Sequence, residues 1–413
     1  MKHVKYLIIG AGVSGLTFAY QKRNEDFLIL EKEAEIGGLA RSFNSLGFTW
    51  DVAGHFFHFH NAETERFYGN FVRDHKTISA RKCAKIFYGG KFIDAPFQYN
   101  IHQLEPDEFF QCLTDLYYSG SKKDVDNFED FVVNEYGEGI SSKFIIPYNE
   151  KLYACKMNSL EKDSMREFLP KLDFDLLMKH YKGAHASTYN DVFEYPVEGC
   201  SVFVKELARS LPRERIRTEQ EVVSIDLSKR TVATKTGEFH YEYLINSAPL
   251  NVFLSCAGQH FGDLLRYNKV LVFNIGFDKK SLDQDVSWAY FPGNEVFYRV
   301  GFYNNIVKDG PLSIYVEIGL SKDECVDLDD AFTRVMGDLK RAGIITDHKV
   351  VTTMSFVISP GYVHITKDGK KFVGDIIHSL NEKGVYMLGR YARWEYSAMD
   401  DSIEQANGLA KLI

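Results

Sequence analysis

The sequence predicts an α/β protein that combines a discontinuous Rossmann-like nucleotide-binding domain, a helical lobe and a mostly antiparallel sheet lobe. A strand–helix–strand pattern opens the chain, helical spacing of apolar residues follows between about 104 and 182, and strand patterns resume at 221. Because helices lie between strand-rich flanks, we expect the nucleotide-binding domain to be interrupted along the chain. The expected parts are 1–82, 193–250 and 372–413 for that domain, 100–192 for the helical lobe, and 83–99 with 251–371 for the substrate sheet lobe.

Composition indicates a large globular protein with two or three lobes. Of its 413 residues, 45% are hydrophobic and 14% aromatic, enough for sizeable cores and an apolar cleft. A net charge of −8 argues against a general nucleic-acid surface, so an anionic ligand needs locally placed arginines or backbone N–H groups. Six cysteines without a CxxC pair indicate reduced thiols in a cytoplasmic protein. We expect neither a membrane span nor a signal peptide, because apolar runs are short and the first strand begins at once.

The individual elements follow from local patterns. "VKYLIIG" (4–10) is a continuous apolar run typical of a strand buried on both faces, "VSGLTFAYQKR" (13–23) predicts a helix and "DFLILEK" (26–32) the next strand. "KIFYGGKFI" (85–93) predicts a hairpin with Gly-Gly at its turn. Later segments predict helices at 105–120, 125–137 and 328–343, and strands within 221–249 and at 269–277, 295–303 and 312–320.

The first strand and helix are joined by a dinucleotide-binding pattern. Gly10, Gly12 and Gly15 form GxGxxG; in order, they permit a tight turn, the approach of a pyrophosphate, and close packing of helix on strand. The helix N-terminus adds N–H donors for the phosphates. Glu31 ends the second strand, where an acid accepts hydrogen bonds from a ribose.

Two further segments identify the dinucleotide. "EKEAEIGGLARS" places Gly38 and Arg41 after the acid, and "GVYMLGRYARWEYSAMDD" places Gly389 and Met399 around the start of the last helix. Both resemble the superfamily of FAD-containing amine oxidases, phytoene desaturases and protoporphyrinogen oxidases. The resemblance implies that these four residues contact FAD, which we expect to be bound non-covalently.

Other segments are similar to UDP-galactopyranose mutases, particularly the eukaryotic-type branch. The similarity is scattered over nearly the whole chain, and six segments occur in the family's order. They are "GHFFHFH", "APFQYNI" (95–101), "FIIPYNEKLYACKM" (144–157), "NDVFEYPVEGC" (190–200), "WAYFPGNEVFYRVGFYNN" (288–305) and "GRYARWEYSAMDD".

This resemblance implies an isomerase on an oxidase frame. In that family flavin N5 of reduced FAD attacks the anomeric carbon and displaces the nucleoside diphosphate, and the ring recloses as a furanose without net redox change. NADPH or NADH is the expected reductant, a nucleoside-diphosphate sugar the substrate and UDP-galactose the first choice. A homodimer and a role in polysaccharide biosynthesis are compatible with it.

The resemblance also assigns the diphosphate contacts. Arg299 and Arg390 match the family's diphosphate-binding arginines, which are counted as catalytic, and Tyr362 and Tyr396 match tyrosines that hydrogen-bond the same phosphates. Arginine suits this task because its charge is permanent and its geometry bidentate.

The residues expected to contact the sugar and the base match the family only in part. Gln98 and Asn190 match polar contacts, and Phe97 matches a ring that stacks on the base. Ala95, however, stands where the family has a second aromatic, and Tyr153 stands where it has tryptophan. The base and the hexose therefore stay open, with thymidine diphosphate sugars and modified hexoses as alternatives.

The stretch "DVAGHFFHFH" has three interpretations: a metal site, a core strand or a wall against the flavin. Gly54 and His55 match the family's flavin-side segment, with Ala53 replacing a glycine, which implies that His55 lies beside N5 and handles protons. His58 and His60 lie two apart, but no neighbouring Cys or carboxylate completes a metal site. We therefore predict a flavin wall and no metal, and leave the roles of His58 and His60 open.

Two other functions remain possible from the sequence. An FAD-dependent oxidoreductase, of the amine oxidase or protoporphyrinogen oxidase type, has the same frame, but it needs no diphosphate-binding arginines. A flavin-bound structural or sensor protein needs no polar cleft residues.

Overall fold

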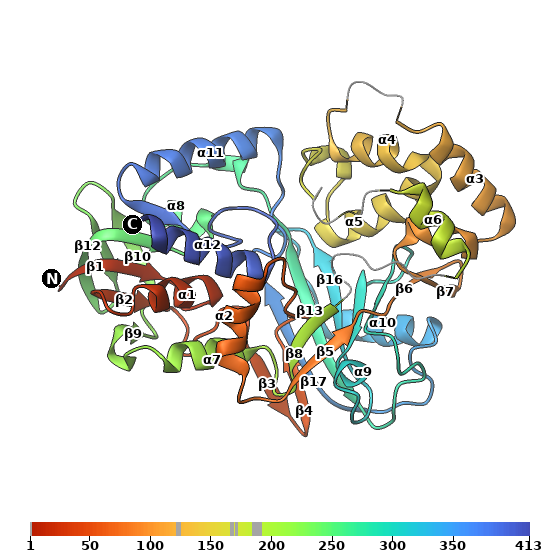
Figure 1. The fold of residues 1–413 in the computed structure, drawn as a ribbon, viewed down its shortest axis with the longest axis horizontal. Helices are drawn as coiled ribbons and strands as arrows, with labels where there is room; N and C mark the ends of the chain where they lie inside the picture. The colour runs from red at the N-terminus through yellow and green to blue at the C-terminus, as the bar shows by residue number, and fades with distance from the viewer. Residues whose placement is uncertain (1, 121–124, 166–168, 170–171, 184–191) are drawn as a thin grey trace.

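Two seven-stranded sheets and a helical lobe make up the molecule (Figure 1). The structure is a computed structural model that describes residues 2–120, 125–165, 169, 172–183 and 192–413. Both chain ends lie in the part built on the first sheet, at the left of Figure 1. The helical lobe lies at the upper right, next to the second sheet. The predicted fold class is thereby confirmed.

The first sheet is the Rossmann-like one. Its central strand β1 (Lys2–Ile9) pairs in parallel with β2 (Phe27–Leu30) on one side and β12 (Gly237–Asn246) on the other. β18 (Val385–Met387) also pairs in parallel with β12, so the beginning, middle and end of the chain meet here. The other strands are β9 (Ile216–Arg217), β10 (Val222–Asp226) and β11 (Thr231–Thr234).

Both faces of this sheet are buried, as the continuous apolar run of β1 predicts. Tyr6 and Ile8 belong to one hydrophobic core, and Leu7 and Ile9 belong to another on the opposite face. The first core also contains residues of α1 (Val13–Gln21), α2 (Ala62–Val72), α7 (Ser201–Arg209) and α12 (Met399–Leu412). The second contains residues of α8 (Leu250–Cys256) and α11 (Lys367–Asn381).

The second sheet is mostly antiparallel, as predicted. Its order is β17-β13-β16-β15-β14-β6-β7, and only β14 and β6 run parallel. One face packs on the amphipathic helix α10 (Leu328–Arg341), which leaves the other face free to line a cavity. The strands are β6 (Ala84–Tyr88), β7 (Lys91–Asp94), β13 (Lys269–Phe277), β14 (Trp288–Tyr290), β15 (Arg299–Phe302), β16 (Ser313–Leu320) and β17 (Val350–Ile358).

The helical lobe contains α3 (Pro106–Tyr117), α4 (Phe128–Ile140), α5 (Ile146–Tyr153) and α6 (Phe174–Tyr181). Smaller pieces connect it to the sheets: the hairpin β3 (Ser42–Ser45) and β4 (Phe48–Asp51), the pair β5 (Thr77–Arg81) and β8 (Val192–Pro196), and α9 (Tyr303–Val307). None of the helices in these described ranges combines the length and the hydrophobicity that crossing a bilayer requires.

Some elements differ from the prediction in extent. The expected hairpin at 85–93 is present as β6 and β7, with Gly89 and Gly90 at positive φ. The expected strand at 295–303 is shorter, because β15 begins only at Arg299. In α4, Gly137 has φ 77°, and a Cβ there would lie 2.6 Å from the backbone of Asp115 in α3, so close helix packing interrupts the regular helix. The domain boundaries stay a prediction.

Candidate active site

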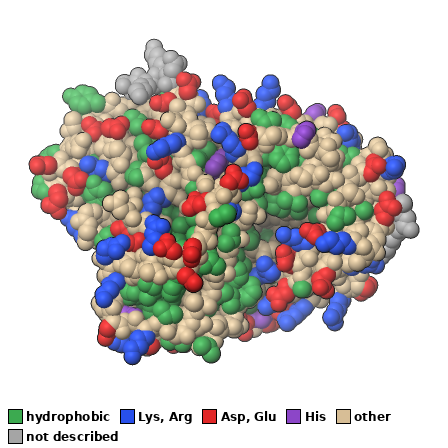
Figure 2. Space-filling view, turned by 180° about the vertical axis from the view of Figure 1, so that it is seen from behind, with side chains coloured by type: hydrophobic (Ala, Val, Ile, Leu, Met, Phe, Trp, Pro, Cys, Tyr) green, Lys and Arg blue, Asp and Glu red, His purple; other side chains and the backbone are tan. Residues whose placement is uncertain are grey.

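A cavity of about 1190 Å³ runs from the carboxyl ends of the first sheet's parallel strands to the free face of the second sheet. From behind, the molecule is hollowed near its middle, with hydrophobic side chains in the hollow (Figure 2). Such a position at the strand ends is the usual ligand site of an open α/β sheet. Most predicted site residues line this one cavity: Gly10, Gly12, Glu31, Gly38, Arg41, His55, Gln98, Arg299, Tyr362, Gly389, Arg390, Tyr396 and Met399.

Two predicted site residues do not line the cavity, and a third is not described. Gly15 is not in the cavity wall; it packs α1 on β1, where a Cβ would lie 2.1 Å from the carbonyl oxygen of Gly10. Phe97 is fully buried and does not line the cavity either. Asn190 lies outside the described residues.

The turn between β1 and α1 is shaped by its glycines. Gly10 has φ +98°, and a Cβ on it would lie 2.5 Å from Oγ of Ser247. At Gly12, in contrast, a Cβ would meet no atom closer than 3.9 Å, so this position is open toward the cavity. The N-cap of α1 is Gly12, which has no side chain to accept from the first N–H groups of the helix. The turn therefore offers an anion both space and donors.

Glu31 is buried at the end of β2. Its Oε2 accepts from the backbone N–H of Ala11 at 2.8 Å, and its Oε1 accepts from the N–H of Glu33 at 3.0 Å. These bonds fix the carboxylate at the cavity wall, and each oxygen keeps a lone pair for a further donor such as a hydroxyl.

The Gly-Gly segment closes over this turn. Gly37 pairs with Gly12 through an isolated bridge, and the N–H of Gly37 donates to the carbonyl of Ala11 at 2.8 Å. Arg41 donates from Nε to the carbonyl of Gly38 at 2.8 Å, which orients its guanidinium along the cavity.

The end of the chain supplies the opposite rim. Gly389 follows β18 with φ +84°, and a Cβ there would lie 2.2 Å from Oγ of Ser14 in α1. The first residues of α12, Ala398 and Met399, line the cavity, and α12 packs against α1. Two helix N-termini therefore face the same cavity, which favours negative charge there.

His55 lies in the cavity wall, close enough to Arg299 and Arg390 to be affected by their charge. Its Nδ1 lies 2.9 Å from the carbonyl oxygen of Ala53; since that oxygen only accepts, Nδ1 carries the proton. Burial lowers the pKa of His55, so the ring is neutral at pH 7 and Nε2 presents a lone pair. Gly54 is required next to it, because a Cβ would lie 2.3 Å from the hydroxyl oxygen of Tyr315.

Arg299 projects from β15 into the cavity and forms a salt bridge with Glu317 on β16. The Nε–Oε2 distance is 2.6 Å, and the Glu317 side chain is only 2% exposed. Burial opposes the charge of Arg299, but the neighbouring Glu317 outweighs it and the pKa lies above its ordinary value. Glu317 was not expected from the sequence, although an acid within the apolar run "SIYVEIGL" was a signal.

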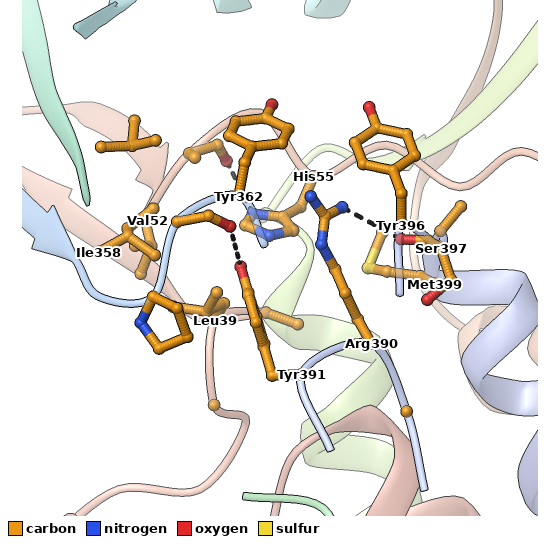
Figure 3. A pocket seen from close by; sticks show the side chains of 18 of the residues that line it. Leu39, Val52, His55, Ile358, Tyr362, Arg390, Tyr391, Tyr396, Ser397 and Met399 are labelled. Atoms are coloured by element: carbon orange, nitrogen blue, oxygen red, sulfur yellow. Dashed lines mark hydrogen bonds between the residues drawn. The ribbon is translucent and has the colours of Figure 1, made fainter. Parts of the chain in front are cut away.

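Arg390 is held by aromatic rings rather than by an acid (Figure 3). Its guanidinium lies 4.5 Å from the ring centre of Tyr396 and 5.1 Å from that of Tyr362, and it donates to the carbonyl of Ser397 at 3.1 Å. The two rings stack at 5.8 Å. Nε of Arg390 is buried and has no hydrogen-bond partner among the described residues. The arrangement leaves donors free for a ligand anion.

The cavity contains more tyrosines than the two that the sequence indicated, Tyr362 and Tyr396. Burial raises the pKa of Tyr396 to about 12, and the pKa of Tyr148 lies well above its ordinary value for the same reason, so both phenols stay protonated. The further tyrosines of the wall, besides Tyr148, are Tyr290, Tyr298, Tyr315 and Tyr391. They come from different segments of the chain, and no local pattern predicts that they share one wall.

An aromatic stack borders the helical lobe. Phe97 packs on Phe144 at 5.2 Å with an interplanar angle of 9°, and Phe144 packs on Tyr148 at 5.3 Å. Phe144 and Tyr148 line the cavity, whereas Phe97 lies behind them. Ala95 lines the cavity as well.

The other two histidines of the wall segment have separate partners. His58 lines the cavity, its Nδ1 lies 3.2 Å from the carbonyl oxygen of Val192, and burial lowers its pKa to about 4. Nδ1 of His60 bonds the carboxylate of Asp400, a residue remote in sequence. His60, Asp400 and Asp401 form a group that geometrically could hold an ion; the expectation that no carboxylate is near was therefore incomplete.

Residues 8–71 match the family of NAD(P)-binding Rossmann-like domains. Over 61 residues the chain is 46% identical to a Baeyer-Villiger monooxygenase of Pseudomonas aeruginosa, a match that covers 14% of this chain and 12% of that protein. The sequence relatives therefore share only a segment with it. A crystal structure of reduced UDP-galactopyranose mutase superposes with a TM-score of 0.90, covering 99% of this chain and 93% of that one at 23% identity.

The chain has the fold of UDP-galactopyranose mutase. The expected resemblance to this family is confirmed in the fold, with two seven-stranded sheets and a helical lobe enclosing one cavity. The fold extends beyond the mutase: a putative protoporphyrinogen oxidase from Exiguobacterium sp. 255-15 superposes with a TM-score of 0.75, 13% identity, and coverage of 100% of this chain and 98% of that one. Proteins with different printed names therefore share this fold, and the fold alone does not decide the reaction.

Proposed function

We propose that this protein is a flavin-dependent nucleotide-sugar mutase that interconverts the pyranose and furanose forms of a UDP-hexose, with UDP-galactose as its substrate. One observation carries the proposal. A single cavity is lined by a dinucleotide cradle, by two half-buried arginines and by a neutral histidine.

The dinucleotide end fits FAD. Gly12 and the N-terminus of α1 leave room and donors for a pyrophosphate, and the carboxylate of Glu31 can accept from a ribose. Gly38, Arg41, Gly389 and Met399 continue the same wall toward His55. Reduced FAD would supply the electron pair that displaces the nucleoside diphosphate from the sugar.

The other end fits a sugar diphosphate. In a chain with net charge −8, Arg299 and Arg390 bring two permanent positive charges to one cavity. Arg390 keeps free donors, and Tyr362 and Tyr396 add phenolic hydroxyls beside it. These groups would hold the departed diphosphate close to the sugar while the ring opens and recloses.

His55 would handle protons during ring opening. Because Nδ1 donates to the carbonyl of Ala53, Nε2 is the atom available to accept a proton from a sugar hydroxyl and return it. Its lowered pKa keeps the ring neutral, which suits this role at pH 7.

The base would bind between the helical lobe and the second sheet. Phe144 and Tyr148 present aromatic faces there, stabilised from behind by Phe97, and Gln98 adds an amide. Base stacking on such a ring contributes about 1–3 kcal/mol. With Ala95 in place of an aromatic, the pocket has one stacking face fewer than the family's, so UDP and TDP sugars should both be tried.

The test is an anaerobic assay with UDP-galactofuranose, following UDP-galactopyranose by anion-exchange chromatography. Protein reduced with dithionite, NADPH or NADH should convert the substrate, and oxidised protein should not. Conversion by both forms, or by neither although nucleotide sugar binds, would contradict the proposal for this sugar. An FAD-dependent oxidoreductase instead predicts that oxidised protein consumes an amine or a reduced porphyrinogen.

A further inference from the structure

The end of α5 is bonded to two side chains that come much later in the sequence. The last carbonyl groups of a helix have no partners within the helix itself. Here the carbonyl oxygen of Leu152 accepts from Nδ2 of Asn268 at 2.7 Å. The carbonyl oxygen of Tyr153 lies 2.9 Å from Nε2 of His364, which carries the proton because a carbonyl oxygen only accepts. Both side chains therefore satisfy the end of this helix.

Asn268 also holds the backbone of Tyr362. Its Oδ1 accepts from the N–H of Tyr362 at 2.7 Å, and its own backbone N–H donates to the carbonyl of Tyr362 at 3.0 Å. The carbonyl of Asn268 accepts from the N–H of Gly361 at 2.8 Å. Because Asn268 is 0% exposed, no solvent can replace the partner of a group that loses its bond. A single buried amide therefore binds the end of α5 and the Tyr362 segment at the same time.

Both residues that Asn268 joins line the cavity, whereas Asn268 itself does not. The ring centre of Tyr362 lies 5.1 Å from the guanidinium of Arg390 (Figure 3). Leu152 belongs to α5, which also carries Tyr148 into the cavity. Asn268 thus connects a diphosphate wall, made of Tyr362 and Arg390, with a base wall, made of Leu152 and Tyr148.

The two walls also touch through aromatic rings, but this contact is less directional than the hydrogen bonds. Tyr153 packs on Tyr362 with ring centres 5.3 Å apart and an interplanar angle of 56°. Tilted rings can slide on each other at little cost, whereas a hydrogen bond weakens steeply when its angle or length changes. The bonds from Asn268 and His364, rather than the rings, therefore fix how far apart the two walls lie.

We propose that Asn268, together with His364, is a positioning residue that fixes Tyr362 relative to the end of α5, and with it the spacing of the two walls. The inference rests on the proposed function in so far as a nucleoside diphosphate binds between these walls. An asparagine amide suits this task because it accepts from one wall and donates to the other. A nucleotide then meets both walls already in place, so little binding free energy is lost in ordering them.

The first experiment compares Asn268→Leu with Asn305→Leu by titration calorimetry of the FAD-loaded protein with UDP. Asn305 is a matched control, because it is 3% exposed, donates from Nδ2 to two backbone carbonyls at 2.8 and 2.9 Å, and does not line the cavity. Both variants should lose stability, but only Asn268→Leu should also bind UDP more weakly, by about 10-fold. Equal UDP affinities in the two variants would overturn the inference.

His364 provides a second test that does not depend on whether Asn268→Leu folds. His364→Gln places an amide nitrogen near the position of Nε2, so it can still donate to the carbonyl of Tyr153 and should keep the wild-type Kd for UDP. His364→Leu cannot donate and should bind UDP more weakly. The same Kd in both His364 variants would contradict the claim that side-chain donors hold the end of α5.

Amide hydrogen exchange, measured by mass spectrometry without any nucleotide, separates this inference from the proposed function. Peptides that cover 359–365 should exchange faster in Asn268→Leu than in Asn305→Leu, because the N–H of Tyr362 loses its acceptor. Faster exchange there, in a protein whose wild type does not bind UDP, would contradict only the nucleotide-sugar proposal. UDP binding by the wild type, with exchange and affinity unchanged in Asn268→Leu, would contradict only this inference.

Discussion

The two arginines of the cavity have different partners, and this difference has measurable consequences. Arg299 is bonded to the buried carboxylate of Glu317, whereas Arg390 lies between tyrosine rings. No salt bridge to Arg390 is present in the described part of the chain. Removing the Arg299 side chain therefore leaves the buried carboxylate of Glu317 without its partner, whereas removing that of Arg390 leaves no buried acid unpaired.

We predict that Arg299→Leu lowers the free energy of unfolding by about 3 kcal/mol, and Arg390→Leu by about 1–2 kcal/mol. Urea denaturation followed by fluorescence measures both. Arg299→Leu combined with Glu317→Leu should regain stability, because no buried charge remains. Each single variant should bind UDP about 10–100-fold more weakly. Equal losses of stability in the two single variants would show that the Glu317 carboxylate is solvated or protonated instead.

Gly54 is a position where no Cβ atom fits next to the His55 wall. We predict that Gly54→Ala weakens FAD retention and costs about 1–3 kcal/mol, because the new Cβ would lie 2.3 Å from the hydroxyl oxygen of Tyr315 and must displace the His55 wall. Gly69→Ala in α2 meets no atom within 4 Å and serves as the control. Retention is measured as the FAD-to-protein ratio after gel filtration. Normal retention in Gly54→Ala would contradict the claim that a Cβ at this position displaces the wall segment around His55.

Single residues were predictable where one short pattern carries the chemistry. Gly10, Gly12, Glu31 and the two arginines line one cavity, and their binding roles stay a prediction. Glu317 and Asp400 were not predicted as partners, because their pairs depend on strand register and helix docking between segments 18 and 340 residues apart. Phe97 was expected at the cavity, but Phe144 from the helical lobe covers it.

Among the elements, the β3–β4 hairpin holds the flavin-wall segment through a buried acid. Asp51 at the end of β4 is 0% exposed and accepts from Ser42 Oγ at 2.6 Å, Tyr195 OH at 3.0 Å and the N–H of Cys200 at 3.1 Å. Asn274 of β13 donates to its carbonyl at 2.9 Å. One residue thus connects β4 to β8, to the start of α7 and to the second sheet.

The same acid predicts a pH dependence of stability. Burial raises the pKa of Asp51 to about 6, above the ordinary 3.8, so the folded state binds this proton more tightly than the unfolded state. The contribution of Asp51 to stability therefore falls as pH rises from about 4 to about 6, by up to about 3 kcal/mol.

Urea unfolding at pH 4, 5, 6 and 7 checks this, with Asp51→Asn as the comparison. The amide cannot ionise, so wild type minus variant should decline over that range and level off above it. Asp226→Asn, at an exposed turn, is the control, because its carboxylate has a lowered pKa of about 2 and is ionised throughout. A flat difference would mean that the hydrogen bonds to Asp51 fully compensate its burial.

Elements were predicted well where one face or one periodicity dominates. The buried run of β1 and the amphipathic α10 appear as expected. The ends of β15 and α4 do not follow from local pattern, since neighbouring strands and the contact of Gly137 with α3 decide them.

At the scale of the whole molecule, the cavity depends on all three parts of the structure. We predict that FAD raises the melting temperature, with a gain of about 2.7 kcal/mol at a hundredfold excess over Kd, and that UDP adds to it. Gly12→Ala should keep the apoprotein's melting temperature, because its Cβ would meet no atom closer than 3.9 Å, but lose the FAD effect. Differential scanning fluorimetry measures the melting temperatures with and without FAD. A full FAD shift in Gly12→Ala would show that the pyrophosphate does not bind at Gly12.

The fold class was predictable because the dinucleotide pattern and the alternation of strand and helix zones are local features that sum to one architecture. The assembly of the cavity was not, because tyrosines from β14, β16 and the segment after β18 meet only in three dimensions.

The placement of α12 bears on how the protein acquires its cofactor in the cell. The cradle needs both the turn after β1 and the residues from β18 to α12, which are synthesised much later than that turn. A nascent chain that has formed β1, α1 and β2 still lacks Gly389 and Met399, and its α1 still exposes apolar side chains that α12 will cover. The proposed FAD site would therefore be complete only once both segments are folded together, and a chain that lacks the second segment is the form that most needs chaperone protection.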